Sequence, residues 1–239
     1  MKKYISLFIS LFVFIGFSQE KYLGDGPYKQ LIIRGVTLIN GDGSPPKGPV
    51  DIVVENNLIV DIKSVGYPGI EIKDSWRPKL KKGGFELDAN GMYLLPGFVD
   101  MHGHIGGTAQ GADYDYVFRL WMAHGITTVR EPGGRGVDWA VNLKKLSAEN
   151  KIVAPRIIAY TSFGQTGKNF NPLNDLPIST PEMARTWVRA NAKKGADGIK
   201  FFGAEPEIME AALDENKKLG LGSAAHHAQL SVARWNVLN

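Results

Sequence analysis

Two histidines separated by a single glycine are the residues of this chain best suited to hold a metal ion. His102 and His104 follow the apolar segment 97–101, which predicts a β-strand. Residues two apart on a strand point the same way, so both imidazoles project together from its carboxyl end. Two neutral imidazoles on one side form half of a site for Zn²⁺ or a similar ion. The alternative is a surface loop with two unrelated histidines, which the preceding apolar strand disfavours.

Three other residues have simpler expected roles. Gly103 allows the backbone to approach another segment closely. Asp100 lies on the same strand face as the histidines and is a candidate partner for a metal-binding imidazole. His124 stands in the last turn of a predicted helix, before Gly125, where a histidine interacts favourably with the helix dipole. We therefore interpret His124 as structural.

The elements that must position the histidine pair alternate regularly between strand and helix. Strands are expected at 97–101, 126–129, 156–160, 198–202 and 221–225, and helices at 113–124, 137–150, 180–194, 206–219 and from 229 onward. Such alternation predicts an α/β fold with a parallel sheet and outer helices. A closed (β/α)8 TIM-type barrel needs eight units, so residues 96–239 are expected to be the N-terminal part of a barrel, truncated to about five βα units. The loop 161–179 is either a substrate lid or a surface insertion.

The first ninety-five residues divide into three further segments. Residues 1–18 have a basic start, a 14-residue apolar run and small residues at its end, the layout of a secretory signal peptide cleaved near Ser18. A membrane anchor would need ~20 apolar residues. Residues 19–30 have the composition of a linker. Short β-rich runs over 31–95 predict a small antiparallel unit, a β-sandwich domain, in which the turn sequence 88–91 joins two strands.

Composition excludes several classes of protein. Hydrophobic residues make up 44% of the 239 residues, enough for a globular core. Without residues 1–18 the net charge falls from +4 to +2, and the one basic cluster, at 77–82, resembles a solvated loop; we expect no nucleic-acid partner. The absence of cysteine excludes disulfides and thiolate metal sites. We expect an exported protein, periplasmic or secreted, with no stable membrane anchor.

The segment Pro96 to His104, PGFVDMHGH, closely resembles the PGF(I/V)D-x-H-x-H motif of the amidohydrolase superfamily. The resemblance covers the chain from about Leu31 to its end and is greatest to the imidazolonepropionase-like and Xaa-Pro dipeptidase-like branch. HGITTVR at 124–130 resembles that branch's GVTTVRD strand, with Glu131 in place of the usual Asp. APRII at 154–158 resembles its GPR strand. In this family a small β-sandwich precedes the barrel.

The resemblance implies two further metal ligands. GADGIK at 195–200 resembles the family's GAD-x-IK run, whose lysine is carboxylated by CO₂ and bridges two metal ions, which makes Lys200 a candidate; taken alone, it would fit a lysine reaching solvent. The segment 220–226 resembles the strand whose last histidine binds the second metal, which favours His226. The family often has HAH there, whereas this chain has HHA, so His227 remains the alternative.

For the whole protein the resemblance implies hydrolysis of a C–N bond, in an amide, peptide or cyclic amide, by a metal-bound hydroxide. Two divalent ions are expected, Zn²⁺ first, with Mn²⁺ or Fe²⁺ as alternatives, and the substrate would be a small molecule or dipeptide. The catalytic Asp of the family would lie beyond Asn239, so this chain alone is expected to be incomplete and inactive. Alternatives are a truncated, non-catalytic metal-binding or assembly module, and an exported sugar- or peptide-binding protein without metal. Substrate, metal identity and oligomeric state are left open.

Overall fold

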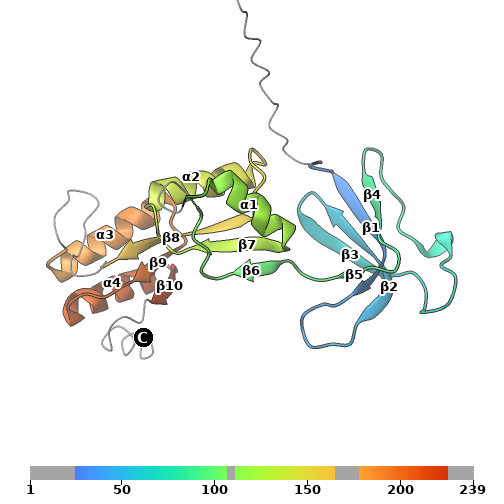
Figure 1. Cartoon of the computed structure of the whole chain (residues 1–239). Coiled ribbons are helices and arrows are strands. Elements are labelled where there is room, and N and C mark those ends of the chain that lie inside the picture. The colour runs from blue at the N-terminus through green and yellow to red at the C-terminus, as the bar shows by residue number, and fades with distance from the viewer. Residues whose placement is uncertain (1–24, 107–110, 165–177, 226–239) are drawn as a thin grey trace, which may run out of the picture.

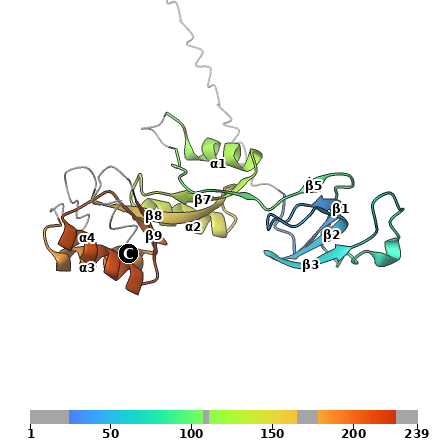
Figure 2. The ribbon, with the colours of Figure 1, turned by 90° about the horizontal axis from the view of Figure 1, so that it is seen from below.

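The computed structural model describes residues 25–106, 111–164 and 178–225 of the chain. Within these ranges the chain forms two units, each built on its own five-stranded sheet. Figures 1 and 2 show the units side by side, joined by the segment between β5 (Tyr93–Leu94) and β6 (Phe98–Asp100). The predicted signal peptide and residues 19–24 of the predicted linker lie outside the described residues.

The N-terminal unit is a mixed sheet in the order β3-β2-β1-β4, with β5 also paired to β1. Its strands are β1 (Gln30–Leu38), β2 (Lys47–Glu55), β3 (Leu58–Ser64) and β4 (Phe85–Asp88), and the short 3-10 helix η1 (Asp74–Trp76) lies between β3 and β4. β2 pairs with β1 and β3 in antiparallel fashion, as expected. The described residues of this unit form one sheet, and the second layer of a sandwich stays a prediction.

The expectation of a wholly antiparallel unit is wrong for β4 and β5, which both pair with β1 in parallel. The turn sequence 88–91 therefore does not reverse the chain into a hairpin. Ala89 is buried in the core of the unit, and its N–H donates to the carbonyl of Arg34 at 3.0 Å. The N–H of Thr37 then donates to the carbonyl of Met92 at 2.9 Å. The chain thus continues along β1 instead of turning back.

The C-terminal unit is an α/β fold with a curled, entirely parallel sheet in the order β10-β9-β8-β7-β6. After β6 come α1 (Tyr114–Ala123), β7 (Ile126–Glu131), α2 (Val137–Ala148), β8 (Arg156–Phe163), α3 (Pro181–Lys194), β9 (Gly198–Phe201), α4 (Pro206–Lys218) and β10 (Gly222–Ala225). This confirms the predicted alternation of strand and helix. Among the described residues, no helix combines the length and apolar character needed to cross a bilayer.

Strand β8 is three residues longer than predicted and continues to Phe163. The predicted loop therefore begins later than residue 161, and its residues 165–177 lie outside the described ranges. Phe163 is fully buried and stacks edge-on against Trp187 at 5.2 Å between ring centroids. This contact with α3 places the last residue of β8 in the core, which is why the strand continues to Phe163.

Successive residues of the parallel strands divide between the helix side and the opposite face of the sheet. Val129, Ile157, Phe163, Ile199 and Phe201 are buried in two clusters with residues of the four helices. Because side chains alternate along a strand, the residues between them face the other way. That opposite face is where the sheet can present polar groups.

The carboxylate of Asp197, the residue before β9, connects this strand to β8 and α2. The Thr180 side chain caps α3 by accepting a hydrogen bond from the N–H of Met183 at 3.2 Å, and Gly195 ends the helix in the left-handed conformation at φ 102°. The Asp197 side chain then accepts from the N–H of Ala159 at 2.8 Å and from Lys144 Nζ at 2.6 Å. These contacts fix β9 beside β8 and so set the position of the residues that follow.

We expect Asp197→Ala to destabilise the C-terminal unit by about 1–3 kcal/mol, because it leaves the buried N–H of Ala159 without an acceptor. Urea denaturation followed by circular dichroism measures the loss. Asp138→Ala is the matched control, since Asp138 also pairs with a lysine, Lys194 at 2.7 Å, but is 74% exposed. An exposed pair contributes about 0–1 kcal/mol. Equal losses in the two variants would contradict the positioning role of Asp197.

Candidate metal centre

The histidine pair lies immediately after β6, at its carboxyl end. The centroids of the His102 and His104 rings are 5.3 Å apart, with the rings inclined at 62°. Gly103 between them donates its N–H to the carbonyl of Arg130 at 3.2 Å. A side chain at residue 103 would collide with Val129 and lie 3.0 Å from Trp121. The close backbone approach expected at Gly103 is therefore present, and it holds the pair against β7.

Asp100 acts on the backbone of the pair. Its Oδ1 accepts a hydrogen bond from the N–H of His102 at 2.9 Å. This bond tightens the turn after β6, which positions His102. The expected contact of Asp100 with an imidazole ring stays a prediction.

Lys200 lies at the centre of β9 and is only 4% exposed. The interpretation as a strand-end lysine reaching solvent is therefore wrong. Its neighbours Ile199 and Phe201 are fully buried in the cluster with α3 and α4, so Lys200 belongs to the opposite face. Its Nζ lies 5.9 Å from the centroid of the Phe202 ring.

Arg130 and Tyr160 occupy the same face of the sheet, on β7 and β8. The Arg130 guanidinium carbon lies 5.2 Å from the centroid of the Tyr160 ring. Side chains at Gly198 or Gly222 would collide with the Tyr160 ring and hydroxyl, so these two glycines make room for it. Within the described part of the chain, the buried Arg130 Nε has no hydrogen-bond partner. Sequence reasoning assigned no role to Arg130 or Tyr160.

Burial and positive charge together favour the neutral forms of His102 and Lys200. Burial lowers the pKa of His102, and the positive charges of Lys200, His104 and Arg130 lower it further, against a small opposing effect of Asp100. Burial also lowers the pKa of Lys200, and Arg130 adds to this effect. These interactions show that His102, Lys200 and Arg130 are electrostatic neighbours.

Glu131, the last residue of β7, is a buried carboxylate beside the histidine pair and only 1% exposed. Its Oε1 lies 3.7 Å from His104 Nδ1. The same carboxylate accepts hydrogen bonds from three backbone N–H groups, of Ile105 at 2.8 Å, Gly133 at 3.0 Å and Gly134 at 2.8 Å. The sequence offered one signal for it, the family resemblance, in which Glu131 stands in place of the usual Asp.

The chain has three further histidines, His124, His226 and His227. His226 and His227 lie outside the described residues. His124 caps the carboxyl end of α1, with its Nδ1 2.8 Å from the Leu120 carbonyl oxygen, as expected for a structural residue. Within the described ranges, no three His, Asp or Glu side chains come together as a group that could hold a metal ion. A complete ligand set therefore stays a prediction.

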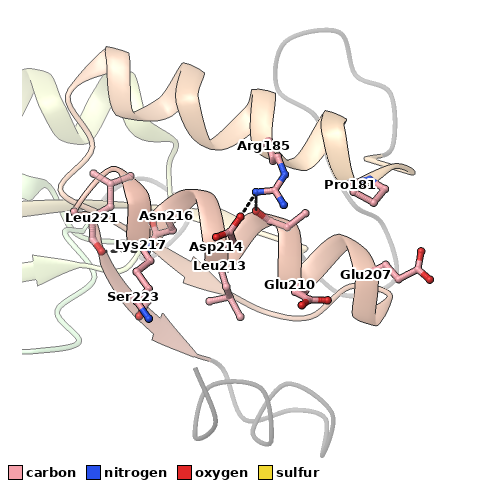
Figure 3. Close-up of a pocket in the computed structure, with 12 residues that line it drawn as sticks. Pro181, Arg185, Glu207, Glu210, Leu213, Asp214, Asn216, Lys217, Leu221 and Ser223 are labelled. Atoms are coloured by element: carbon pink, nitrogen blue, oxygen red, sulfur yellow. Dashed lines mark hydrogen bonds and ion pairs between the residues drawn. The ribbon is translucent and has the colours of Figure 1, made fainter.

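A cavity of about 850 Å³ lies away from these residues, along α3, α4 and the start of β10. Figure 3 shows Arg185 of α3 reaching across to an ion pair with Asp214 of α4 at its wall. None of the predicted site residues lines it. Its position on the helix side of the sheet separates it from the face that carries Lys200.

The chain is similar to several curated proteins and solved structures. The chain is 32% identical over 108 residues to adenine deaminase 2 of Desulfotalea psychrophila, covering 41% of this chain and 18% of that protein. It is 24% identical over 216 residues to a dihydroorotase of Geobacter metallireducens, covering 87% and 45%. The crystal structure of a Xaa-Pro dipeptidase with bound methionine matches with a TM-score of 0.58 and 25% identity, covering 82% and 56%. No family profile matches the chain.

These similarities indicate the amidohydrolase superfamily, in agreement with the resemblance of the HGH segment. They also match the parallel half-barrel sheet of the C-terminal unit. The chain spans less than half the length of either curated relative and 56% of the dipeptidase chain. What the whole protein acts on is therefore a separate question.

We expect Arg130→Gln to raise the pKa of Lys200 toward its ordinary value, because a nearby positive charge that penalises the ammonium form is removed. Burial remains, so the pKa should stay below the ordinary value. The measurement is an NMR titration of ¹³C-labelled lysine in the chain without metal or bicarbonate. Arg135→Gln is the control, since Arg135 makes the same kind of contact, 4.9 Å from the Trp139 ring, and does not affect Lys200. An unchanged Lys200 pKa in the first variant would contradict this assignment.

Proposed function

We propose that this chain carries the metal-binding part of a hydrolase that cleaves C–N bonds in amides, peptides or cyclic amides. The observations that carry the proposal are that His102 and His104 lie together after β6, and that buried Lys200 of β9, on the same parallel sheet, is close enough to lower the pKa of His102. The carboxyl ends of parallel barrel strands are where such folds build active sites. The names of the similar proteins, a deaminase, a dihydroorotase and a dipeptidase, support small molecules or dipeptides as substrates.

The chemistry of the residues present fits a divalent cation. Metal ions bind the neutral imidazole, and the surroundings of His102 favour that form. Lys200 and Arg130 would repel a cation if both were charged. The lowered pKa of Lys200 favours its neutral amine, the form that can react with CO₂ to give an anionic carbamate. We therefore propose His102, His104, carboxylated Lys200 and His226 as the ligand set.

When bound, two divalent ions would supply an activated water and would polarise the carbonyl of the substrate. The chain's own residues would do the positioning. Gly103 holds the histidines against β7, Asp100 fixes the backbone of His102, and the Tyr160 ring packs over Gly198 and Gly222 on the face that carries Lys200. Arg130 stacks on Tyr160 and keeps the local potential positive, which favours an anionic group at Lys200.

The full-length protein, prepared with Zn²⁺ and bicarbonate, is expected to hydrolyse members of a panel of dipeptides and N-acyl amino acids. His102→Ala and His104→Ala should each lower kcat/KM more than ~100-fold, since even indirect partners of metal ligands contribute 10- to 100-fold. A chelator should abolish activity, and Zn²⁺ should restore it.

His124→Ala is the control for this experiment and should retain activity, because His124 only caps α1. Folded His102→Ala and His104→Ala variants that keep full activity would overturn the proposed site. Tight Zn²⁺ binding without turnover of any amide would overturn the hydrolase and leave a metal-binding module.

We also propose that residues 1–18 are a signal peptide and that the mature protein is periplasmic or secreted. Expression with the native N-terminus should give a mature chain that begins at Gln19, as found by N-terminal sequencing. Lys2→Glu together with Lys3→Glu removes the basic start and should leave the precursor uncleaved inside the cell. A secreted chain that retains Met1 would contradict cleavage at this point.

A further inference from the structure

Glu131 joins two loops of the candidate metal centre through backbone hydrogen bonds alone. Its Oε2 accepts from the N–H of Ile105, in the segment that follows His104, at 2.8 Å. Its Oε1 accepts from the N–H groups of Gly133 and Gly134, in the turn after β7, at 3.0 and 2.8 Å. One carboxylate therefore holds the segment after β6 to the segment after β7.

The environment of this carboxylate requires polar partners. A carboxylate that is 1% exposed is costly unless hydrogen bonds satisfy it. An ionised carboxylate offers about four acceptor sites, and the three backbone N–H groups occupy three of them. His104 Nδ1 lies 3.7 Å from Oε1 and could occupy the fourth site. The negative charge thus lies beside Nδ1, and the proposed cation would be held through Nε2.

We propose that Glu131 is the positioning residue for His104. Its charge favours an N–H at Nδ1, because a lone pair directed at a carboxylate would be repelled, and this leaves the lone pair of Nε2 free for the cation. The separation of 3.7 Å is longer than a hydrogen bond, and a small rotation of the ring would close it. The inference rests on the proposed function, since it assigns His104 as a ligand through Nε2.

Gly134 leaves the space in which ring and carboxylate meet. A Cβ at residue 134 would lie 3.1 Å from His104 Nδ1 and 3.3 Å from Glu131 Oε1, beside their contact and close to both groups. The backbone of Gly134 does not require a positive φ, so an alanine there would test the space and not backbone strain. Gly134→Ala therefore perturbs the contact while keeping every charge and all three backbone N–H donors of Glu131.

The experiment is ¹⁵N NMR of the histidine rings in the metal-free chain at a pH where His104 is neutral. In the wild type, His104 should carry its proton on Nδ1. In Glu131→Gln and in Gly134→Ala, a large part of the population should move to the Nε2–H tautomer. His124 serves as an internal reference, because its Nδ1 faces the Leu120 carbonyl at 2.8 Å and should not change.

Zn²⁺ affinity, measured by competition with a chelator, should fall 10- to 100-fold in Glu131→Gln. Glu149→Gln is the control for loss of an acid, since Glu149 is exposed and pairs with Lys151 at 2.7 Å outside the site. If Glu131→Gln fails to fold, Gly134→Ala decides the question alone. A wild-type His104 protonated on Nε2, or the same tautomer in folded variants, would overturn the proposal. A tautomer shift in a protein that hydrolyses nothing would overturn only the proposed function.

Discussion

Side chains alternate across each strand of the parallel sheet, and the apolar half of that alternation packs against the helices. Ile199 and Phe201 are completely buried against α3 and α4, next to Trp187. Lys200, between them, must therefore lie on the opposite face. A slip of β9 by one residue would place the amine among aromatic rings and both apolar side chains outside the core. The position of the candidate ligand thus depends on where the helices make their apolar contacts.

The face defined in this way concentrates positive charge. Lys200 and Arg130 lower the pKa of His102, and no acid on this face neutralises Arg130 among the described hydrogen bonds and ion pairs. In the unmodified state such a group of residues attracts anions more than cations. Carboxylation of Lys200 would replace a positive charge by a negative one at the centre of the group. Arg130, which adds to burial in lowering the pKa of the Lys200 amine, would also stabilise the negative charge of the modified side chain, which joins the metal proposal to the electrostatics of the fold.

Much of the C-terminal unit was predictable because its signals are local. The predicted helix 180–194 agrees with α3, because Thr180 caps its start and Gly195 ends it in the left-handed conformation. The parallel pairing of β4 and β5 with β1 was not predictable in this way. Asp88 to Gly91 is a good hairpin sequence, but the contacts that decide its path are with Arg34 and Thr37, more than fifty residues earlier. Strand pairing depends on such distant contacts, and a local turn signal cannot report them.

The residues of the candidate site also divide into those with a local sequence signal and those without one. The His-Gly-His spacing was visible because strand geometry converts it into a shared direction. Lys200 needed the family resemblance, since a lone lysine in a strand has no distinctive pattern. Glu131 was noted only as a departure from the family's usual Asp, because its partners are backbone N–H groups, which leave no trace in residue types. A glutamate reaches one methylene further than an aspartate, and here its two oxygens serve two different loops. We therefore interpret this departure as a matter of reach, which couples the length of one side chain to the orientation of His104.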